Sequence, residues 1–118
     1  MGILGVKLID GKKAGNFENF DIQEVFKIDT YNNSGHSVPC YHTRRGMFVG
    51  ISTLAECKKA FGFIQLDNGT LADAGQISHI TDNGWAVVAH FYRTNKTANV
   101  ARSKKQMIEH LIQNLSEA

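Results

Sequence analysis

Apolar and polar residues alternate through much of the first fifty positions, and turn-like steps interrupt the alternation. Residues 5–9 alternate and run into Asp10-Gly11, a dipeptide that favours a tight hairpin turn. Residues 31–36 are rich in Asn, Ser and Gly and are predicted to form a polar loop. Three further strands are predicted over residues 21–29, 37–42 and 47–51, with residues 43–46 as the hairpin loop between the last two.

The apolar spacing changes in the middle of the chain. Apolar residues recur three and four positions apart over residues 54–61, which predicts a short helix with one buried face. Thr53, followed by Glu56 three positions later, predicts a capping box at the start of this helix. Gly62 is well placed to end it.

The pattern then returns to short strands before a final helix. Strands are predicted over residues 63–66, 76–80, 85–92 and 97–101, with turns at 67–69 and 82–84. The last segment carries apolar residues on one helical face, at Met107, Ile108, Leu111, Ile112 and Leu115. The whole pattern predicts one mainly β domain over residues 1–118, with a short inner helix and a C-terminal amphipathic helix.

Length and composition are those of one soluble domain. The 118 residues are 42% hydrophobic and contain no run close to the roughly 20 apolar residues that a membrane span needs. The N-terminus lacks the charged and apolar regions of a signal peptide, and two cysteines without an export signal are expected to be reduced thiols. We therefore expect a cytoplasmic protein.

Basic residues gather near the end of the chain. The net charge is only +2, with a pI near 8.6. Residues 93–105 contain Arg93, Lys96, Arg102, Lys104 and Lys105 and no acid, whereas seven of the eleven acids precede residue 70. A locally basic stripe on a nearly neutral domain can still dock on a nucleic-acid duplex.

Catalytic and metal-binding patterns are weak. Cys40 and His42 are two apart on a predicted strand and so share a face, and His36 and Cys57 could join them around zinc. The spacing matches no zinc motif, however, and a half-buried cysteine with a surface histidine explains the same residues. The chain lacks a Gly-x-Ser-x-Gly motif and a glycine-rich phosphate loop. We expect no enzyme activity, no metal site and no cofactor.

Three polar segments contain residue types that contact DNA. They are Asn32 to His36 with Asn33 and Ser34, Asp67 to Thr70 with Asn68, and Arg102 to Lys104. Asn and Arg can read adenine and guanine edges through two hydrogen bonds, and Ser and Lys suit phosphates. Turns are also made of Asn, Ser and Gly, so composition alone leaves both readings open.

Order and spacing of these segments resemble the LytTR family of bacterial DNA-binding domains. The family's central motif has an apolar strand opening with Phe, a basic position, His-Arg or His-Asn, Ser, and an apolar run ending in Val-Asn. Residues 63–73 lie on this motif without a gap, Ile77 falls on an Ile that follows it, and residues 99–102 match a closing Val-Ser-Arg-like motif. The chain has Asp67, Gly69 and Asp73 where the motif has His, Ser and Asn.

The resemblance implies an elongated fold of roughly ten short antiparallel strands in small sheets, with loops that enter successive major grooves. It places His36 on the His of the first contact loop, Asn68 on the Arg or Asn of the central motif, and Arg102 on the closing Arg. Asn33, Ser34, Arg93, Lys104 and Lys105 are expected to add further DNA contacts.

The expected function is therefore that of a stand-alone, sequence-specific regulator of transcription that binds double-stranded DNA. Typical family members carry a receiver domain in front, for which 118 residues leave no room. A second copy of the chain on a tandem site is a further expected partner. The alternative is a protein-interaction module that kept the fold, lost DNA binding and modulates another regulator. Asp67, Asp73 and the low net charge favour this alternative.

Overall fold

The computed structural model describes residues 2–10, 12–33, 35–50 and 54–117, without the side chains of residues 12–15, 33, 36, 54–56 and 113–117. The described residues form ten strands and two α-helices. The strands are β1 (Gly2–Ile9), β2 (Lys12–Asp21), β3 (Val25–Asn33), β4 (His36–Thr43), β5 (Gly46–Val49), β6 (Ile64–Asp67), β7 (Thr70–Ala72), β8 (Ile77–Asp82), β9 (Val87–Phe91) and β10 (Thr97–Val100). The helices are α1 (Leu54–Phe61) and α2 (Lys105–Glu117).

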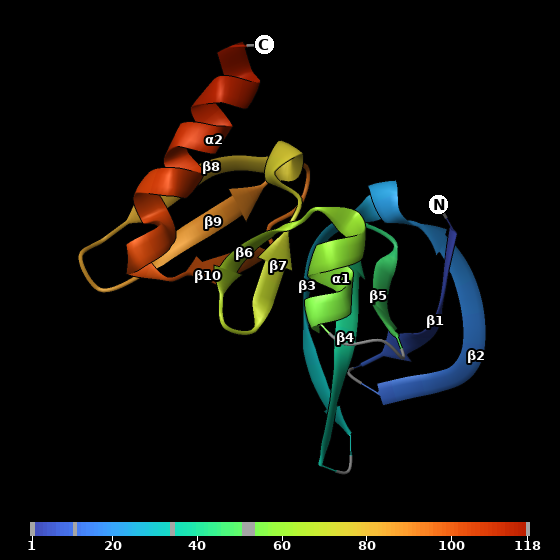
Figure 1. The fold of residues 1–118 in the computed structure, drawn as a ribbon. Coiled ribbons are helices and arrows are strands. Elements are labelled where there is room, and N and C mark those ends of the chain that lie inside the picture. Colours follow the sequence, from blue (N-terminus) through green and yellow to red (C-terminus); the bar gives the residue numbers. More distant parts are fainter. Residues whose placement is uncertain (1, 11, 34, 51–53, 118) are drawn as a thin grey trace.

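The strands form two antiparallel sheets. The larger sheet has the order β2-β1-β5-β4-β3-β7-β6, and the smaller sheet has the order β10-β9-β8. Figure 1 shows the larger sheet strongly curved, with α1 on one of its faces, while α2 lies along the smaller sheet. The molecule measures 40 × 30 × 26 Å along its principal axes. The predicted mainly β fold, with antiparallel strands, a short inner helix and a C-terminal helix, is confirmed.

Predicted boundaries were wrong at two places near β3. Residues 31–33 and 36, which were predicted as loop, belong to β3 and β4, which continue pairing to their tips, where Asn33 lies opposite His36. Polar residues are tolerated there because backbone groups make the ladder, and the Ser37 hydroxyl also donates to the Asn32 side chain. Residues 22–24 form a 3-10 turn instead of the start of a strand, since the Asp21 carboxylate accepts from the backbone N–H of Gln23.

The predicted inner helix is confirmed as α1. Cys57 is 2% exposed and lies in the core beneath it. Gly62 has φ of 68°, and its N–H donates to the Lys58 carbonyl at 3.2 Å, so glycine ends the helix in the left-handed conformation. Thr53 and the side chain of Glu56, which were predicted to form the capping box, lie outside the described residues.

β3 contributes side chains to both main cores. Val25 and Ile28 belong to the core shared with α1. Phe26 belongs instead to the core between the sheets, and the register of β3 against β4 shifts between Val25 and Lys27. A bulge of this kind turns two successive side chains to the same side of the strand. Phe26 and Lys27 therefore both face the smaller sheet, where the Lys27 ammonium donates to the Thr97 carbonyl at 2.9 Å.

Helix α2 packs on the smaller sheet through part of its predicted apolar face. Ile108 is fully buried and Ile112 packs against the same core. Met107 was also expected on this face but is 50% exposed, because the buried stripe follows the i, i+4 spacing of Ile108 and Ile112. Neither described helix has the length and apolar composition that crossing a bilayer requires.

The packing predicts a large stability difference between two Phe→Ala substitutions. Phe26 is fully buried between the sheets, so Phe26→Ala should lower the free energy of unfolding by about 3–5 kcal/mol. Phe17 is 64% exposed on β2, and Phe17→Ala should change it by about 0.5 kcal/mol or less. Urea denaturation of both variants measures the difference. Similar losses would contradict the assignment of Phe26 to a shared core.

Candidate nucleic-acid interface

The three segments predicted to contact DNA lie at neighbouring positions in the fold. Strand β7 pairs with β3 in antiparallel fashion, with Leu71 opposite Ile28. The β6–β7 turn and the β3–β4 tip therefore point to the same end of the larger sheet, and the tip projects farther. Figure 1 shows the tip, the turn and the start of α2 following one another along the lower left of the molecule.

The β6–β7 turn lies beside the junction between β10 and α2. The Ala101 N–H donates to the Leu66 carbonyl at 2.7 Å, so the strand end before Arg102 is bonded to the strand that leads into the turn. Asn68 is exposed at the turn. The Asp67 carboxylate accepts from the Gly69 N–H at 2.9 Å and shapes the turn. The fold thus brings Asn68 and Arg102, which are far apart in sequence, to one region.

Arg102 is held by a carboxylate that sequence reasoning did not single out. Its Nη1 and Nη2 atoms donate to Asp82 Oδ2 at 2.8 Å and Oδ1 at 3.2 Å. The Lys105 ammonium lies 3.0 Å from Asp82 Oδ2, and the Gly84 N–H donates to Oδ1 at 2.9 Å. We call Asp82, Arg102 and Lys105 the Asp82 ion-pair cluster. Residues 82–84 were interpreted only as a turn, and the ion pair depends on the fold bringing β8 to the start of α2.

Electrostatics keep this cluster ionised. The Arg102 guanidinium, the Gly84 N–H and the Lys105 ammonium together hold the pKa of Asp82 well below its usual range. Asp82 in turn raises the pKa of Arg102. The Arg102 side chain is still 55% exposed and the Lys105 side chain 33% exposed, so both remain accessible. Arg102 and Lys104 belong to one 3-10 turn, in which the Lys104 N–H donates to the Ala101 carbonyl.

A shallow pocket adjoins the Asp82 ion-pair cluster. It has a volume of about 280 Å³ and is lined by Trp85, Ala86, Val87, Asn99, Val100 and Arg102. Trp85 lies in the β8–β9 turn and is 94% exposed. The backbone N–H groups of Trp85 and Ala86 both donate to the Asn83 side chain, which fixes the turn that carries the indole. Sequence reasoning assigned Trp85 to a strand and missed this pocket.

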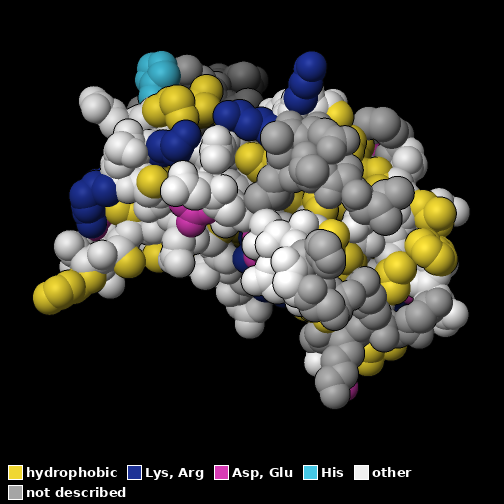
Figure 2. Space-filling model, turned by 60° about the horizontal axis from the view of Figure 1, so that its bottom comes forward, with side chains coloured by type: hydrophobic (Ala, Val, Ile, Leu, Met, Phe, Trp, Pro, Cys, Tyr) yellow, Lys and Arg dark blue, Asp and Glu magenta, His cyan; other side chains and the backbone are white. Residues whose placement is uncertain are grey.

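Other predicted contact residues are not joined to this region. Arg93 lies before β10 and Arg102 after it, so the strand separates the two ends of the basic stripe. Lys96, from the same stripe, is directed to His42. Ser34 lies outside the described residues, as do the side chains of Asn33 and His36. Figure 2 shows Lys and Arg side chains on the part of the surface at the upper left, with one acidic patch between them.

A second polar cluster lies between the two sheets. His42 Nε2 lies 2.8 Å from Asp29 Oδ1, and its Nδ1 lies 3.3 Å from the Lys96 ammonium. An ammonium can only donate, so Nδ1 accepts and Nε2 carries the proton. The Lys27 ammonium lies 3.8 Å from Asp29 Oδ2. His42 is 6% exposed, so the expectation of a surface histidine was wrong.

The same cluster contains the residues considered for zinc. The ligand atoms of Asp29, Cys40 and His42 lie within 4.8 Å of one another. Burial, with the Asp29 charge second, raises the pKa of the Cys40 thiol to about 12, whereas zinc needs a thiolate. The ammonium groups of Lys27 and Lys96 also oppose a cation there. These charges favour a hydrogen-bonded network.

Cys57, the other candidate zinc ligand, lies apart from this network. It is part of the core beneath α1, where its sulfur lies 3.3 Å from the Tyr41 hydroxyl. Cys40 and His42 flank Tyr41 on β4, and neighbouring residues of a strand point to opposite faces. The zinc ligands considered from the sequence are thus divided between two faces of the sheet.

A solved structure is similar in fold to this chain. The chain resembles the LytTr DNA-binding domain of a Bacillus cereus protein described as a methyl-accepting/DNA response regulator, with a TM-score of 0.70 and 10% sequence identity. The match covers 94% of this chain and 95% of that chain. No protein-family model matches the sequence, and no curated protein matches it either. The chain has the LytTR fold, as the motif resemblance implied.

The hydrogen-bonded network of His42, Asp29, Lys27 and Lys96 predicts that the stability of the fold depends on pH. Burial lowers the pKa of His42, and this effect outweighs the opposing one of Asp29. Below the unfolded histidine pKa of about 6.5, the unfolded chain therefore binds a proton that the folded chain does not, and stability should fall as pH falls from about 7.5 to 5.5. His42→Gln should flatten this slope, by at most about 1.4 kcal/mol per pH unit.

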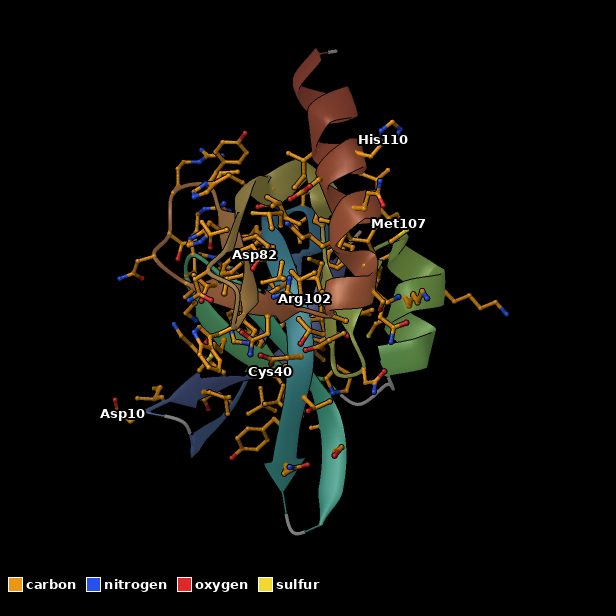
Figure 3. The ribbon with its side chains drawn as sticks, turned by 90° about the vertical axis from the view of Figure 1, so that its left-hand side faces the viewer. Asp10, Cys40, Asp82, Arg102, Met107 and His110 are labelled. Atoms are coloured by element: carbon orange, nitrogen blue, oxygen red, sulfur yellow. The ribbon has the colours of Figure 1, made fainter. Side chains whose placement is uncertain are left out.

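Urea denaturation at several pH values measures this effect. His110→Gln is the matched control, because His110 is exposed on α2, outside the network (Figure 3). This control should keep the pH profile of the unsubstituted protein. A profile that His42→Gln leaves unchanged would show that His42 does not contribute to the slope.

Proposed function

We propose that the protein is a sequence-specific regulator of transcription that binds double-stranded DNA through loops in the major groove. The observation that carries the proposal is that the β3–β4 tip, the β6–β7 turn with Asn68 and the β10–α2 junction with Arg102 follow one another along one side of a LytTR-like fold (Figure 1). Loops on rigid strands are common positions for binding residues. The DNA-binding domain named for the similar structure supports the same reading.

The dimensions of the molecule suit successive grooves of a duplex. Contacts to neighbouring major grooves on one side of B-DNA are about 34–36 Å apart. The longest axis of the protein is 40 Å, so separate loops can reach both grooves without a recognition helix. In this proposal the Arg102 junction and the β3–β4 tip, with Asn33, Ser34 and His36, occupy different grooves, and the Asn68 turn lies between them.

The side chains of the proposed interface fall into two groups, those suited to base edges and those suited to phosphates. Arg102 suits guanine and Asn68 suits adenine, each through two hydrogen bonds. Lys104 and Lys105 suit phosphates, which set register without reading sequence. Asp67 shapes its turn, and Asp73 accepts from the Gly75 N–H at 3.1 Å at the start of a 3-10 turn. The two acids that depart from the motif therefore have structural roles and argue less against DNA binding than their charges alone suggest.

A protein-interaction module is the second candidate function. The observation that favours it is a group of exposed apolar side chains on β1 and β2. Leu4 is 56%, Ile9 58% and Phe17 64% exposed, and β2 is an edge strand. Exposed apolar groups on an edge strand are typical of surfaces that bind protein.

Selection from a random pool of double-stranded DNA at near-physiological salt tests the proposal. The protein should enrich one motif, and the Asn68→Ala/Arg102→Ala double variant should lose it, because each two-bond base contact contributes about 1–3 kcal/mol of discrimination. Lys59→Ala is a control that removes one positive charge from the exposed surface of α1, outside the proposed contact segments. It should keep the motif. If the folded protein enriches no sequence, the second candidate is favoured.

The salt dependence of DNA affinity distinguishes residues that contact phosphates from residues that contact bases. Lys104→Ala should weaken binding to all sequences alike and lower the slope of log affinity against log salt by about one, because one phosphate contact is lost. Titrations of the selected site and of an unrelated duplex between about 50 and 200 mM salt measure this slope. Weakening confined to the selected site would contradict the phosphate role of Lys104.

A further inference from the structure

The Asp82 ion-pair cluster raises the question of what a carboxylate does inside a basic junction. Each carboxylate oxygen of Asp82 accepts two hydrogen bonds. Oδ1 accepts from Arg102 and Gly84, and Oδ2 accepts from Arg102 and Lys105. The side chain is consequently only 19% exposed. Figure 3 shows Asp82 and Arg102 next to each other, where β8 meets the start of α2.

The geometry leaves one edge of the Arg102 guanidinium open. A guanidinium carries five N–H donors in a planar fork. Asp82 uses one donor from each Nη atom, at the end of the fork. The Nε–H and the remaining Nη–H groups have no acceptor among the described residues, so the side edge can still form two parallel hydrogen bonds. Guanine O6 and N7 accept such a pair.

The open edge belongs to a residue that lines the shallow pocket beside Trp85, here called the Trp85 pocket. Arg102 lines the pocket together with Trp85 and Asn99, and all three residues are exposed. Trp85 supplies an aromatic surface at a turn fixed by Asn83, and Asn99 supplies an amide. A base edge or a deoxyribose placed there would meet both polar donors and an indole.

We infer that Asp82 is a positioning residue for base reading, which holds the end of the Arg102 guanidinium so that its side edge faces guanine at the Trp85 pocket. The inference rests on the proposed function. Without the carboxylate, the long Arg102 side chain samples many rotamers and its charge is free to pair with any phosphate. Asp82 therefore limits non-specific attraction and increases discrimination, whereas a residue that only opposed DNA would lower affinity for every sequence alike.

Asp82→Asn is the critical variant, because asparagine can still accept from the Gly84 N–H but carries no charge. Its preference for guanine at one position of the selected site should fall about tenfold, as expected when a two-bond contact is weakened. Its affinity for unrelated DNA should rise, and the salt slope should steepen by about one, since a released cation gains a phosphate. Emission from Trp85, the only tryptophan, should change on binding the selected site.

Two further variants separate positioning from a loss of structure. In an Arg102→Ala background, Asp82→Asn should leave base discrimination unchanged, because its effect passes through Arg102. Asp10→Asn is the matched control: it removes the same charge from a turn on the larger sheet, far from Asp82 in Figure 3, and should change neither measurement. Thermal unfolding of each variant checks that it is folded.

The outcomes distinguish the inference from the proposed function. Reduced guanine preference together with stronger non-specific binding supports the positioning role. If Asp82→Asn keeps the preference, or lowers it equally in the Arg102→Ala background, the positioning role is overturned while specific DNA binding stands. If the unsubstituted protein selects no DNA sequence, the proposed function fails and this inference fails with it.

Discussion

The bulge at Phe26 is the constraint on which the arrangement of the two sheets depends. Neither sheet can bury an apolar face alone, and β3 contributes to both main cores, as β7 does through Leu71 and Ala72. The shift of register after Val25 sends Phe26 into the core between the sheets while Ile28 stays beneath α1. With a regular alternation, Phe26 would be directed to the α1 side instead. The smaller sheet would then lose its largest partner in the larger one.

Polar contacts at the boundary complete this packing and make it directional. Arg44, in the β4–β5 turn, donates to Gln76 at 2.9 Å and to the Tyr92 carbonyl at 2.6 Å, and Gln76 donates back to the Val25 carbonyl at 3.0 Å. His42 and Lys27 connect the same sheets through Lys96 and Thr97. Apolar burial is not directional, whereas hydrogen bonds specify one relative orientation. The loops on the two sheets consequently have a defined spacing.

A defined spacing matters for a protein proposed to read DNA from loops. The Arg102 junction follows the smaller sheet, and the β3–β4 tip belongs to the larger one, so movement between the sheets would change the distance between proposed contacts. The near-neutral net charge of +2 fits such an interface, because rigid placement of a few basic groups can replace a large positive field. Asp82 restricts a single side chain in a similar way, because its carboxylate holds one edge of the Arg102 guanidinium.

The sequence by itself determined most of the local structure. The spacing of apolar residues located both helices and the strands other than β2 and β7, which were not predicted. Gly62 marked the end of α1 because a left-handed residue favours glycine. Polar composition misplaced the β3–β4 tip, since backbone pairing does not depend on polar side chains. The motif resemblance also identified the fold, although 10% identity to the similar structure leaves few matched residues.

Only the tertiary structure decided which distant groups meet. Local patterns depend on neighbouring residues, so they could not show that Asp82 pairs with Arg102 or that Lys96 reaches His42. They also placed Arg93 with Arg102 in one stripe, although β10 holds the two apart. The two contacts join residues 20 and 54 positions apart and arise from the packing of the two sheets and α2. The fold class follows from local periodicity, whereas the site follows from long-range packing.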